Sequence, residues 1–248
     1  MLEARIEKYW TNRSSVYGSS ISDEMKSFKR NVWQSLVTRF AGKGGTMKVL
    51  DVGTGPGFFA ILMAELGYEV TAVDTSSDML REAKKNARYA GFKIDFAGGD
   101  AQKIDFPDGS FDLIVSRNLV WTLTNPLEAY KEWYRLLNPS GRVLVFDANW
   151  YLRLSVSELQ QKYEYYRSIA REMGFSDKVT EEQHRECETI ARKLPLTYEI
   201  RPAWDRNALI KCGFKDVMIE ANINKLVYDD REKIIYEATP MFAICACK

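Results

Sequence analysis

An aspartate followed by glycines at alternate positions is the feature of this chain that most directly indicates chemistry. Asp51 closes an apolar run, and a second apolar run begins after the last glycine, so the segment predicts a strand, a tight loop and a helix start. Glycines let a backbone approach a ligand more closely than a Cβ atom allows, and the first amides of the helix would point at the same ligand. The candidate binding residues of this loop are Asp51, Gly53, Thr54, Gly55, Pro56 and Gly57.

The spacing of the glycines distinguishes two kinds of nucleotide ligand. The dinucleotide fingerprint G-x-G-x-x-G needs a third glycine where this chain has Phe58, which disfavours NAD. The carboxylate of Asp51 would attract an ammonium group and repel a pyrophosphate. The loop therefore favours a ligand with an amino group over a dinucleotide.

The elements that must position this loop alternate along the first part of the chain. Strands are expected near residues 47–52, 69–73, 93–97, 111–116 and 142–146, with helices near 57–66, 75–91 and 126–137. Strict alternation of this kind predicts a parallel, doubly wound sheet. In such sheets the ligand lies outside the carboxyl ends of the strands, so the residues that follow each strand should converge.

A second carboxylate lies where a nucleoside ligand requires one. Asp74 ends the second strand, roughly 20 residues beyond the glycine loop, where it can accept hydrogen bonds from both ribose hydroxyls. Thr75 follows it and, with Asp78, is expected to form a capping box for the next helix. Asp100 comes directly after the third strand. These positions predict a nucleoside site at one edge of the sheet.

Four segments together resemble the class I S-adenosylmethionine-dependent methyltransferases. They are Asp51 to Gly57, Val73 to Leu80, Gly99 to Ala101 and Leu137 to Arg142, and they look most like the small-molecule branch that includes the ubiquinone/menaquinone C-methyltransferases, which carry a methyltransferase type 11 domain. The resemblance implies an α/β, Rossmann-like, seven-stranded and mostly parallel sheet with helices on both faces and an antiparallel last strand. It also implies S-adenosyl-L-methionine as the cofactor.

The resemblance gives roles to the residues that follow the later strands. Asp100 would accept a hydrogen bond from the adenine amino group, Ala101 would donate its amide, and Met79 would pack on the adenine face. The residues expected under the methionine moiety are Ser116, Asn118 and Leu119. No catalytic base is identified, because His184, the single histidine, lies in a polar run typical of a solvated helix face.

The remaining segments predict a cover for the acceptor side of one methyltransferase domain that spans residues 1–248. A helix is expected from Ser22 onward in the N-terminal cap (1–46), and residues 149–200 form a helical acceptor cap inserted after the fifth strand of the cofactor-binding core (47–148). Residues 201–248 supply the last strands. The candidate acceptor-binding residues are Tyr9, Trp10, Tyr17, Trp121, Asn149, Trp150 and Tyr151.

Composition and charge restrict the partners. The formal net charge is +1, and no basic stripe is evident, so nucleic acid is not expected as a partner. The N-terminus carries charges where a signal peptide needs an apolar core, and no apolar run approaches the roughly 20 residues of a membrane span. These features predict a cytoplasmic protein, monomeric or homodimeric, with no membrane partner and no metal site.

Three other functions fit parts of the pattern. A methyltransferase that acts on RNA or protein would share the cofactor site, and so would a non-catalytic module that binds S-adenosylmethionine. A nicotinamide dehydrogenase is disfavoured by Phe58. The nature of the acceptor, and whether nitrogen, oxygen, sulfur or carbon receives the methyl group, stays open at this point.

Overall fold

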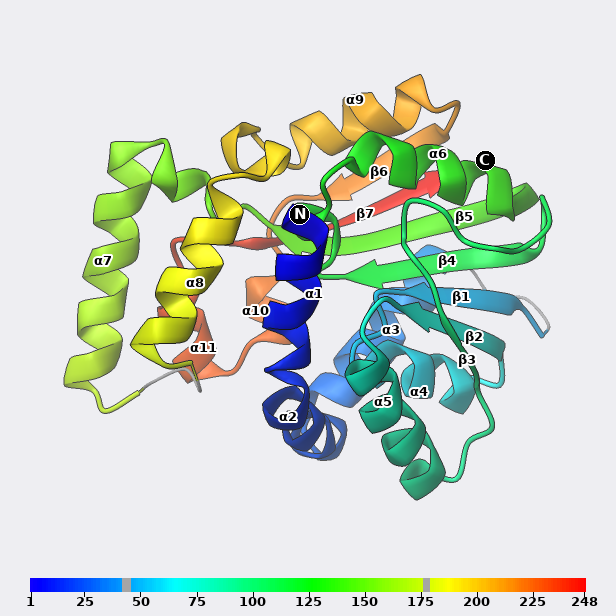
Figure 1. Cartoon of the computed structure of the whole chain (residues 1–248), viewed down its shortest axis with the longest axis horizontal. Coiled ribbons are helices and arrows are strands. Elements are labelled where there is room, and N and C mark those ends of the chain that lie inside the picture. Colours follow the sequence, from blue (N-terminus) through cyan, green and yellow to red (C-terminus); the bar gives the residue numbers. More distant parts are fainter. Residues whose placement is uncertain (42–45, 176–178) are drawn as a thin grey trace.

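The chain folds around one seven-stranded sheet in the computed structural model, which describes residues 1–41, 46–175 and 179–248 (Figure 1). The strand order is β3-β2-β1-β4-β5-β7-β6, and β7 is antiparallel to both of its neighbours. The predicted mostly parallel sheet is therefore confirmed. The strands are β1 (Lys48–Val52), β2 (Glu69–Asp74), β3 (Asp95–Gly98), β4 (Phe111–Arg117), β5 (Leu137–Ala148), β6 (Lys215–Glu220) and β7 (Met241–Cys247).

Helices pack on both faces of this sheet because successive residues of the central strands are apolar and point to opposite faces. Val49 of β1 joins a core with Trp33 and Phe59, whereas its neighbour Leu50 joins a core on the other face with Trp133. The helices are α1 (Leu2–Thr11), α2 (Ser14–Lys26), α3 (Lys29–Ala41), α4 (Phe58–Glu65), α5 (Ser77–Ala90), α6 (Pro126–Leu136), α7 (Ser157–Glu172), α8 (Glu181–Ala191), α9 (Ala203–Lys211), α10 (Asn224–Val227) and α11 (Asp230–Ile235).

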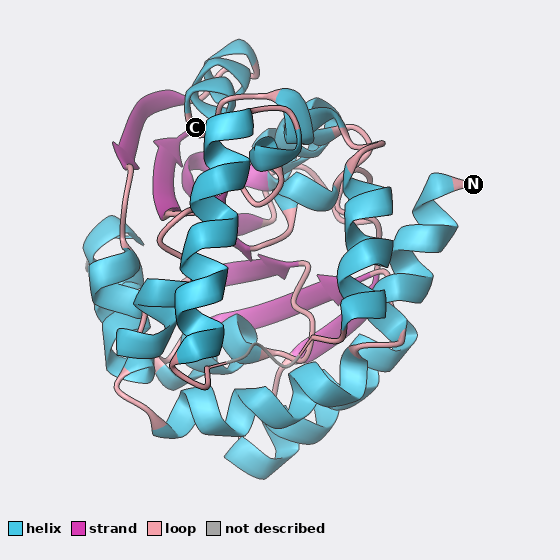
Figure 2. Cartoon of the chain, turned by 90° about the vertical axis from the view of Figure 1, so that its left-hand side faces the viewer, coloured by secondary structure: helices cyan, strands magenta, loops and turns pink. Residues whose placement is uncertain are grey.

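The helical insertion lies beyond the carboxyl ends of the parallel strands. In Figure 1, α1, α8 and α7 follow one another outward from the sheet, and Figure 2 views these helices from their own side. Tyr9 of α1 and Ile190 of α8 share a small apolar cluster with Trp121. The predicted N-terminal helical segment and the insertion after the fifth strand are both present, and they cover the same edge of the sheet.

The N-terminal segment differs from the sequence prediction in one respect. The single helix expected from Ser22 is two helices, because the chain becomes extended at Ser27 (ψ 174°) and its hydroxyl accepts a hydrogen bond from the Lys29 amide at 3.2 Å. Phe28, at the junction between α2 and α3, is 48% exposed. Residues before Ser22 are also helical, in α1 and the first part of α2.

Several element boundaries were also wrong. The residue that caps α5 is Ser76 rather than Thr75, because the Ser76 hydroxyl accepts the Met79 amide at 3.3 Å. β5 begins at Leu137, five residues before the strand expected near 142–146, and its register with β4 shifts in this stretch. The first α-helix of the insertion, α7, begins at Ser157, and α10 and α11 were not expected.

Candidate functional site

A cavity of about 290 Å³ lies at the carboxyl ends of β1, β2 and β4, beneath α1 and α2. This is the switch point of the sheet, because the chain order runs outward in opposite directions from β1 and β4. The predicted cofactor residues that line it are Asp51, Gly53, Thr54, Gly55, Pro56, Asp74, Thr75, Met79, Asp100, Ala101, Asn118 and Leu119. The structure therefore brings together residues that are separated by up to about 70 positions in the sequence.

The glycine loop follows β1 in a conformation that favours glycine. Gly53, Gly55 and Gly57 all have positive φ angles, of 69°, 52° and 93°. A Cβ atom on Gly53 would lie 2.8 Å from the Leu119 side chain, and one on Gly57 would lie 3.1 Å from Ala83 of α5. A Cβ atom on Gly55 would meet nothing within 4 Å, because this glycine faces the open cavity.

Backbone amides fix the Asp74 carboxylate and leave some of its hydrogen-bond acceptor positions unoccupied. Its Oδ2 accepts the Gly55 amide at 2.8 Å and its Oδ1 accepts the Ser76 amide at 2.9 Å. Each carboxylate oxygen has a second acceptor position. Burial raises the pKa of Asp74 above its ordinary value, although the Ser76 and Gly55 amides oppose that change. The carboxylate can thus accept two further hydrogen bonds from a ligand.

Asp51 is the most deeply buried acid of the cavity wall. Its side chain is 2% exposed, and the Thr54 hydroxyl donates to its Oδ2 at 2.6 Å. Burial raises the pKa of Asp51 to about 7, partly offset by the hydrogen bond from Thr54. A cationic ligand group beside it would restore the ionised form.

The loop after β3 is fixed from both sides. The Ala101 carbonyl accepts the indole N–H of Trp133 at 3.0 Å, and Asp100 Oδ1 accepts the Gln102 amide at 2.9 Å. Met79, in the first turn of α5, is buried and also lines the cavity. Contacts of Asp100 and Met79 with an adenine ring stay a prediction.

The turn after β4 holds a strained polar residue. Asn118 has a φ of 57°, and its amide donates to the Phe146 carbonyl at 2.9 Å. Its Oδ1 is buried without a hydrogen-bond partner in the part of the chain that the structure describes. A buried acceptor of this kind is costly unless a ligand or water donates to it.

Two predicted cofactor residues do not line the cavity. Ser116 is fully buried, and its hydroxyl donates to the Val52 carbonyl at 3.0 Å, which ties the end of β4 to the end of β1. Gly57 packs against Ala83 instead. Both residues shape the wall from behind, and a direct ligand contact by either one stays a prediction.

The predicted acceptor residues divide into three groups. Trp10 and Tyr17 line the cavity. The second group, Tyr9, Trp121 and Tyr151, lies behind Trp10. The ring centroids are 5.1 Å apart for Tyr9–Trp10, 6.2 Å for Trp10–Trp121 and 5.0 Å for Trp121–Tyr151. This aromatic stack supports the cavity wall from α1 to the insertion.

The third group is Asn149 and Trp150, which form part-buried hydrogen bonds and do not line the cavity. Asn149 accepts the Arg201 amide at 3.1 Å and donates to the Arg201 carbonyl, while the Trp150 indole donates to Asp147 at 2.9 Å. The Arg201 guanidinium bridges Asp147 at 2.7 Å and Asp205 at 2.8 Å, and all three side chains are inaccessible to solvent. An acceptor contact by Asn149 or Trp150 stays a prediction.

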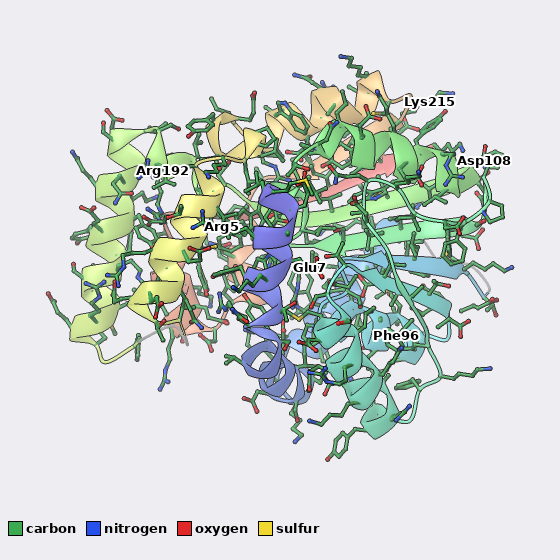
Figure 3. All side chains as sticks on the ribbon, in the orientation of Figure 1. Arg5, Glu7, Phe96, Asp108, Arg192 and Lys215 are labelled. Carbon is green, nitrogen blue, oxygen red and sulfur yellow. The ribbon has the colours of Figure 1, made fainter. Side chains whose placement is uncertain are left out.

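Sequence reasoning expected aromatic residues from the N-terminal helices but missed several other residues of these helices. Ile6 and Glu7 of α1 line the cavity, as do Ile21 and Glu24 of α2. Figure 3 shows Arg5 and Glu7 on opposite sides of α1; Arg5 forms an ion pair with Glu186 of α8 at 2.7 Å. The available signal was the spacing of Tyr17, Ile21 and Glu24, which places them on one helix face.

Arg117 lines the cavity with the rest of the segment expected after the fourth strand, whereas the wall residues Phe58 and Phe59 were missed. The Arg117 guanidinium donates to Glu24 from both terminal nitrogens, at 2.7 and 3.1 Å. Burial opposes the charge of Arg117, but the Glu24 carboxylate more than compensates and raises its pKa. The pair connects α2 to the end of β4 across the cavity wall.

The described residues offer neither a metal-binding cluster nor a membrane-spanning helix. Across the described ranges, no three His, Cys, Asp or Glu side chains gather in a way that would hold a metal ion. Within the same ranges, no helix has the length and apolar character needed to cross a membrane.

Comparisons with known proteins match this arrangement. Residues 50–145 match the model of a methyltransferase domain. The ubiquinone/menaquinone biosynthesis C-methyltransferase UbiE of Desulfotalea psychrophila is 38% identical over 118 residues, which cover 46% of this chain and 47% of that protein. The chain thus aligns with about half the length of this relative.

Solved structures support the fold. Phosphoethanolamine N-methyltransferase 2 of Haemonchus contortus, in complex with phosphomonomethylethanolamine and S-adenosylhomocysteine, superposes with a TM-score of 0.65 at 17% identity, over 96% of this chain and 59% of that one. A SAM-dependent methyltransferase of Aquifex aeolicus gives a TM-score of 0.58 at 19% identity, over 93% and 97%. Residues 50–145 thus match a methyltransferase domain, and the chain resembles the class I S-adenosylmethionine-dependent methyltransferases of the ubiquinone/menaquinone C-methyltransferase group.

Proposed function

We propose that this chain transfers a methyl group from S-adenosylmethionine to a small-molecule acceptor. The observation that carries the proposal is the cavity in which the glycine loop, Asp51 and Asp74 face one another. In this proposal residues 47–148 hold the cofactor, residues 1–46 and 149–200 cover the acceptor side, and residues 201–248 complete the sheet, so that the chain works as one unit.

The donors and acceptors of the cavity fit this cofactor. Asp74 has acceptor positions left for the two ribose hydroxyls, and the buried Asp51 suits an ammonium group. Gly55 faces open space where a Cβ atom would obstruct a ligand. The buried Oδ1 of Asn118 lacks a donor among the described residues, and the amino end of methionine can supply one.

The protein's contribution is alignment and exclusion of water. When bound, the cofactor supplies a methyl group on a positively charged sulfur, which an acceptor atom takes by in-line displacement. The wall formed by Trp10, Tyr17 and Ile21 keeps water from the reacting atoms, and the backbone of the glycine loop fixes the nucleoside. His184 lies near Arg167 of α7 at 3.4 Å and does not line the cavity, so no proton transfer is assigned to it.

The charges on the wall favour a neutral acceptor or an amine. Arg117 is the one cation among the described lining residues, and Glu24 already pairs with it. A phosphate-bearing acceptor such as phosphomonomethylethanolamine would meet mainly carboxylates, whereas a quinol or an amine would not be repelled. The aromatic rings of Trp10 and Tyr17 suit a planar acceptor as well as a cationic product.

Titration calorimetry with S-adenosylhomocysteine, and with NAD as the competing ligand, tests the cofactor assignment. We expect binding of S-adenosylhomocysteine that NAD does not displace. Incubation of the protein with isotope-labelled methyl donor and a metabolite extract then identifies the acceptor. Binding without any labelled product would favour a non-catalytic module, and label in RNA or protein would favour a macromolecular acceptor.

A further inference from the structure

We propose that β6 is the contact surface for a second copy of this chain, with the two β6 strands paired antiparallel across a two-fold axis. β6 ends the seven-stranded sheet of the described residues and pairs with β7 alone, so its outer edge can accept another strand. No residue of β6 is among those that line the described cavity, so this inference goes beyond the proposed function and does not rest on it.

The middle of β6 exposes apolar side chains. Met218 is 48% exposed and Ile219 is 36% exposed, and as successive residues of a strand they point to opposite faces of the sheet. Ile210, near the end of the helix α9 that leads into β6, is 46% exposed. Edge strands that stay unpaired commonly carry charges at such central positions, whereas exposed apolar residues favour contact with another chain.

A bulge gives β6 the symmetry that pairing with its own copy requires. Lys215 is opposite Cys247 of β7 and Met218 is opposite Cys245, so three steps along β6 match two steps along β7. The extra residue lies in the bulge, where Asp216 has a φ of 47°. The bulge therefore counts as one position, and Met218 is the central position of the strand from Lys215 to Glu220. A two-fold axis at Met218 places every position of one β6 opposite an equivalent position of the other.

The two ends of β6 carry opposite charges that would meet in this pairing. With the axis at Met218, Lys215 of one copy lies opposite Glu220 of the other, twice in the dimer. These three residues share one face of the sheet, because their partners on β7 are alternate residues. Val217 packs against the apolar core of the other face, to which Ile219 also points. Apolar residues would thus meet apolar residues, and each lysine would meet a carboxylate.

Both charged ends are accessible to a partner. Lys215 is exposed, and Figure 3 shows it at the margin of the molecule, far from α7 and α8. Glu220 pairs with Arg39 of α3, whose side chain is 57% exposed, and a carboxylate can accept hydrogen bonds from two cations. The contact of one six-residue strand is small beside the roughly 1,200 Å² that stable complexes bury, so we expect a reversible dimer whose population rises with concentration.

Sedimentation velocity of the full chain tests this contact. We expect the fraction of dimer to rise between about 1 and about 100 μM. Met218→Lys places two ammonium groups at the axis and should weaken dimerisation about tenfold or more, while thermal unfolding changes little because this side chain is half exposed. A protein that stays monomeric over this range, or a dimer that Met218→Lys does not weaken, would overturn the proposal.

Two charge reversals test the pairing of the strand ends. Lys215→Glu and Glu220→Lys would each create two like-charge contacts in their own dimer, so each variant alone should dimerise about tenfold more weakly. In a mixture of the two, the heterodimer again has opposite charges at both contacts. Energy transfer between differently labelled variants should therefore show an affinity within about threefold of that of the unmodified protein. A mixture that pairs no better than either variant alone would refute the proposed arrangement.

The matched control is Lys93→Glu, which reverses an exposed charge just before β3, at the opposite edge of the sheet. This variant should dimerise as the unmodified protein does, and a loss comparable to that of Lys215→Glu would show that the contact is not at β6. Calorimetry with S-adenosylhomocysteine on the same variants reports the proposed function separately, because no residue of β6 lines the described cavity.

Discussion

Replacing Asp51 with asparagine should stabilise the ligand-free protein while weakening its binding site. Asp51 is buried, and its pKa is raised from 3.8 to about 7 because the interior disfavours the carboxylate. An acid with a raised pKa keeps a proton in the folded state that the unfolded chain has already released. The free energy of unfolding should therefore fall as pH rises from about 4 to about 7.

The size of this effect follows from the two pKa values. A difference of about three corresponds to about 4 kcal/mol of lost stability above pH 7, of which about 3 kcal/mol develops between pH 5 and pH 8. Asparagine stays neutral over this range and keeps an oxygen that can accept the Thr54 hydroxyl. The variant Asp51→Asn should thus be the more stable protein at pH 8, and its advantage should shrink toward pH 5.

Urea unfolding of both proteins without ligand, at about pH 5 and about pH 8, measures this difference directly. The control is Asp230→Asn, whose carboxylate is 98% exposed and should show no comparable pH dependence. At pH 8 the same Asp51→Asn variant should bind S-adenosylhomocysteine less tightly, because the partner of the ligand's ammonium group is gone. An advantage of Asp51→Asn that is the same at both pH values would refute the account of Asp51 as a buried, proton-binding acid.

Three further substitutions have distinct expected results. Asp74→Asn should weaken S-adenosylhomocysteine binding by about 1.5–3 kcal/mol in calorimetry, because an amide replaces a charged acceptor of ribose hydroxyls; a change below twofold would contradict this role. Gly55→Ala should lower the free energy of unfolding by about 1 kcal/mol in thermal unfolding, because alanine is strained at a φ of 52°. The same variant should lose more free energy of ligand binding than of unfolding, because the new Cβ atom would enter the cavity. Binding as tight as that of the unmodified protein would show that the loop does not face the ligand. Arg201→Ala should destabilise the fold by about 3–5 kcal/mol in urea unfolding, because Asp147 and Asp205 would stay buried without their cation; a loss under 1 kcal/mol would argue against that network.

The cofactor side of the cavity was predictable because its residues are specified by local sequence. Short-range patterns specify three features of this side: the strand before Asp51, the positive φ angles of the glycines and the position of Asp74 at the end of β2. Parallel strands then bring their carboxyl ends to one edge whatever the details of packing. Twelve of the fourteen predicted cofactor residues line the cavity for this reason.

The acceptor side was less predictable because it depends on contacts between distant segments. Arg5 of α1 pairs with Glu186, a residue 181 positions away, and no local pattern identifies such a partner. Side-chain type is also ambiguous: Asn149 and Trp150 suit a ligand pocket, yet both are occupied by part-buried hydrogen bonds to Arg201 and Asp147. The ion pair of Arg117 with Glu24 likewise has no local signal, because the two residues are 93 positions apart in the sequence.

A crystal structure of the protein with S-adenosylhomocysteine tests the central claim most directly. The account predicts that the ribose hydroxyls lie within hydrogen-bond distance of Asp74 and that the adenine lies between Met79 and Asp100, inside the cavity described above. A structure in which the ligand binds elsewhere while side chains fill this cavity would contradict the account.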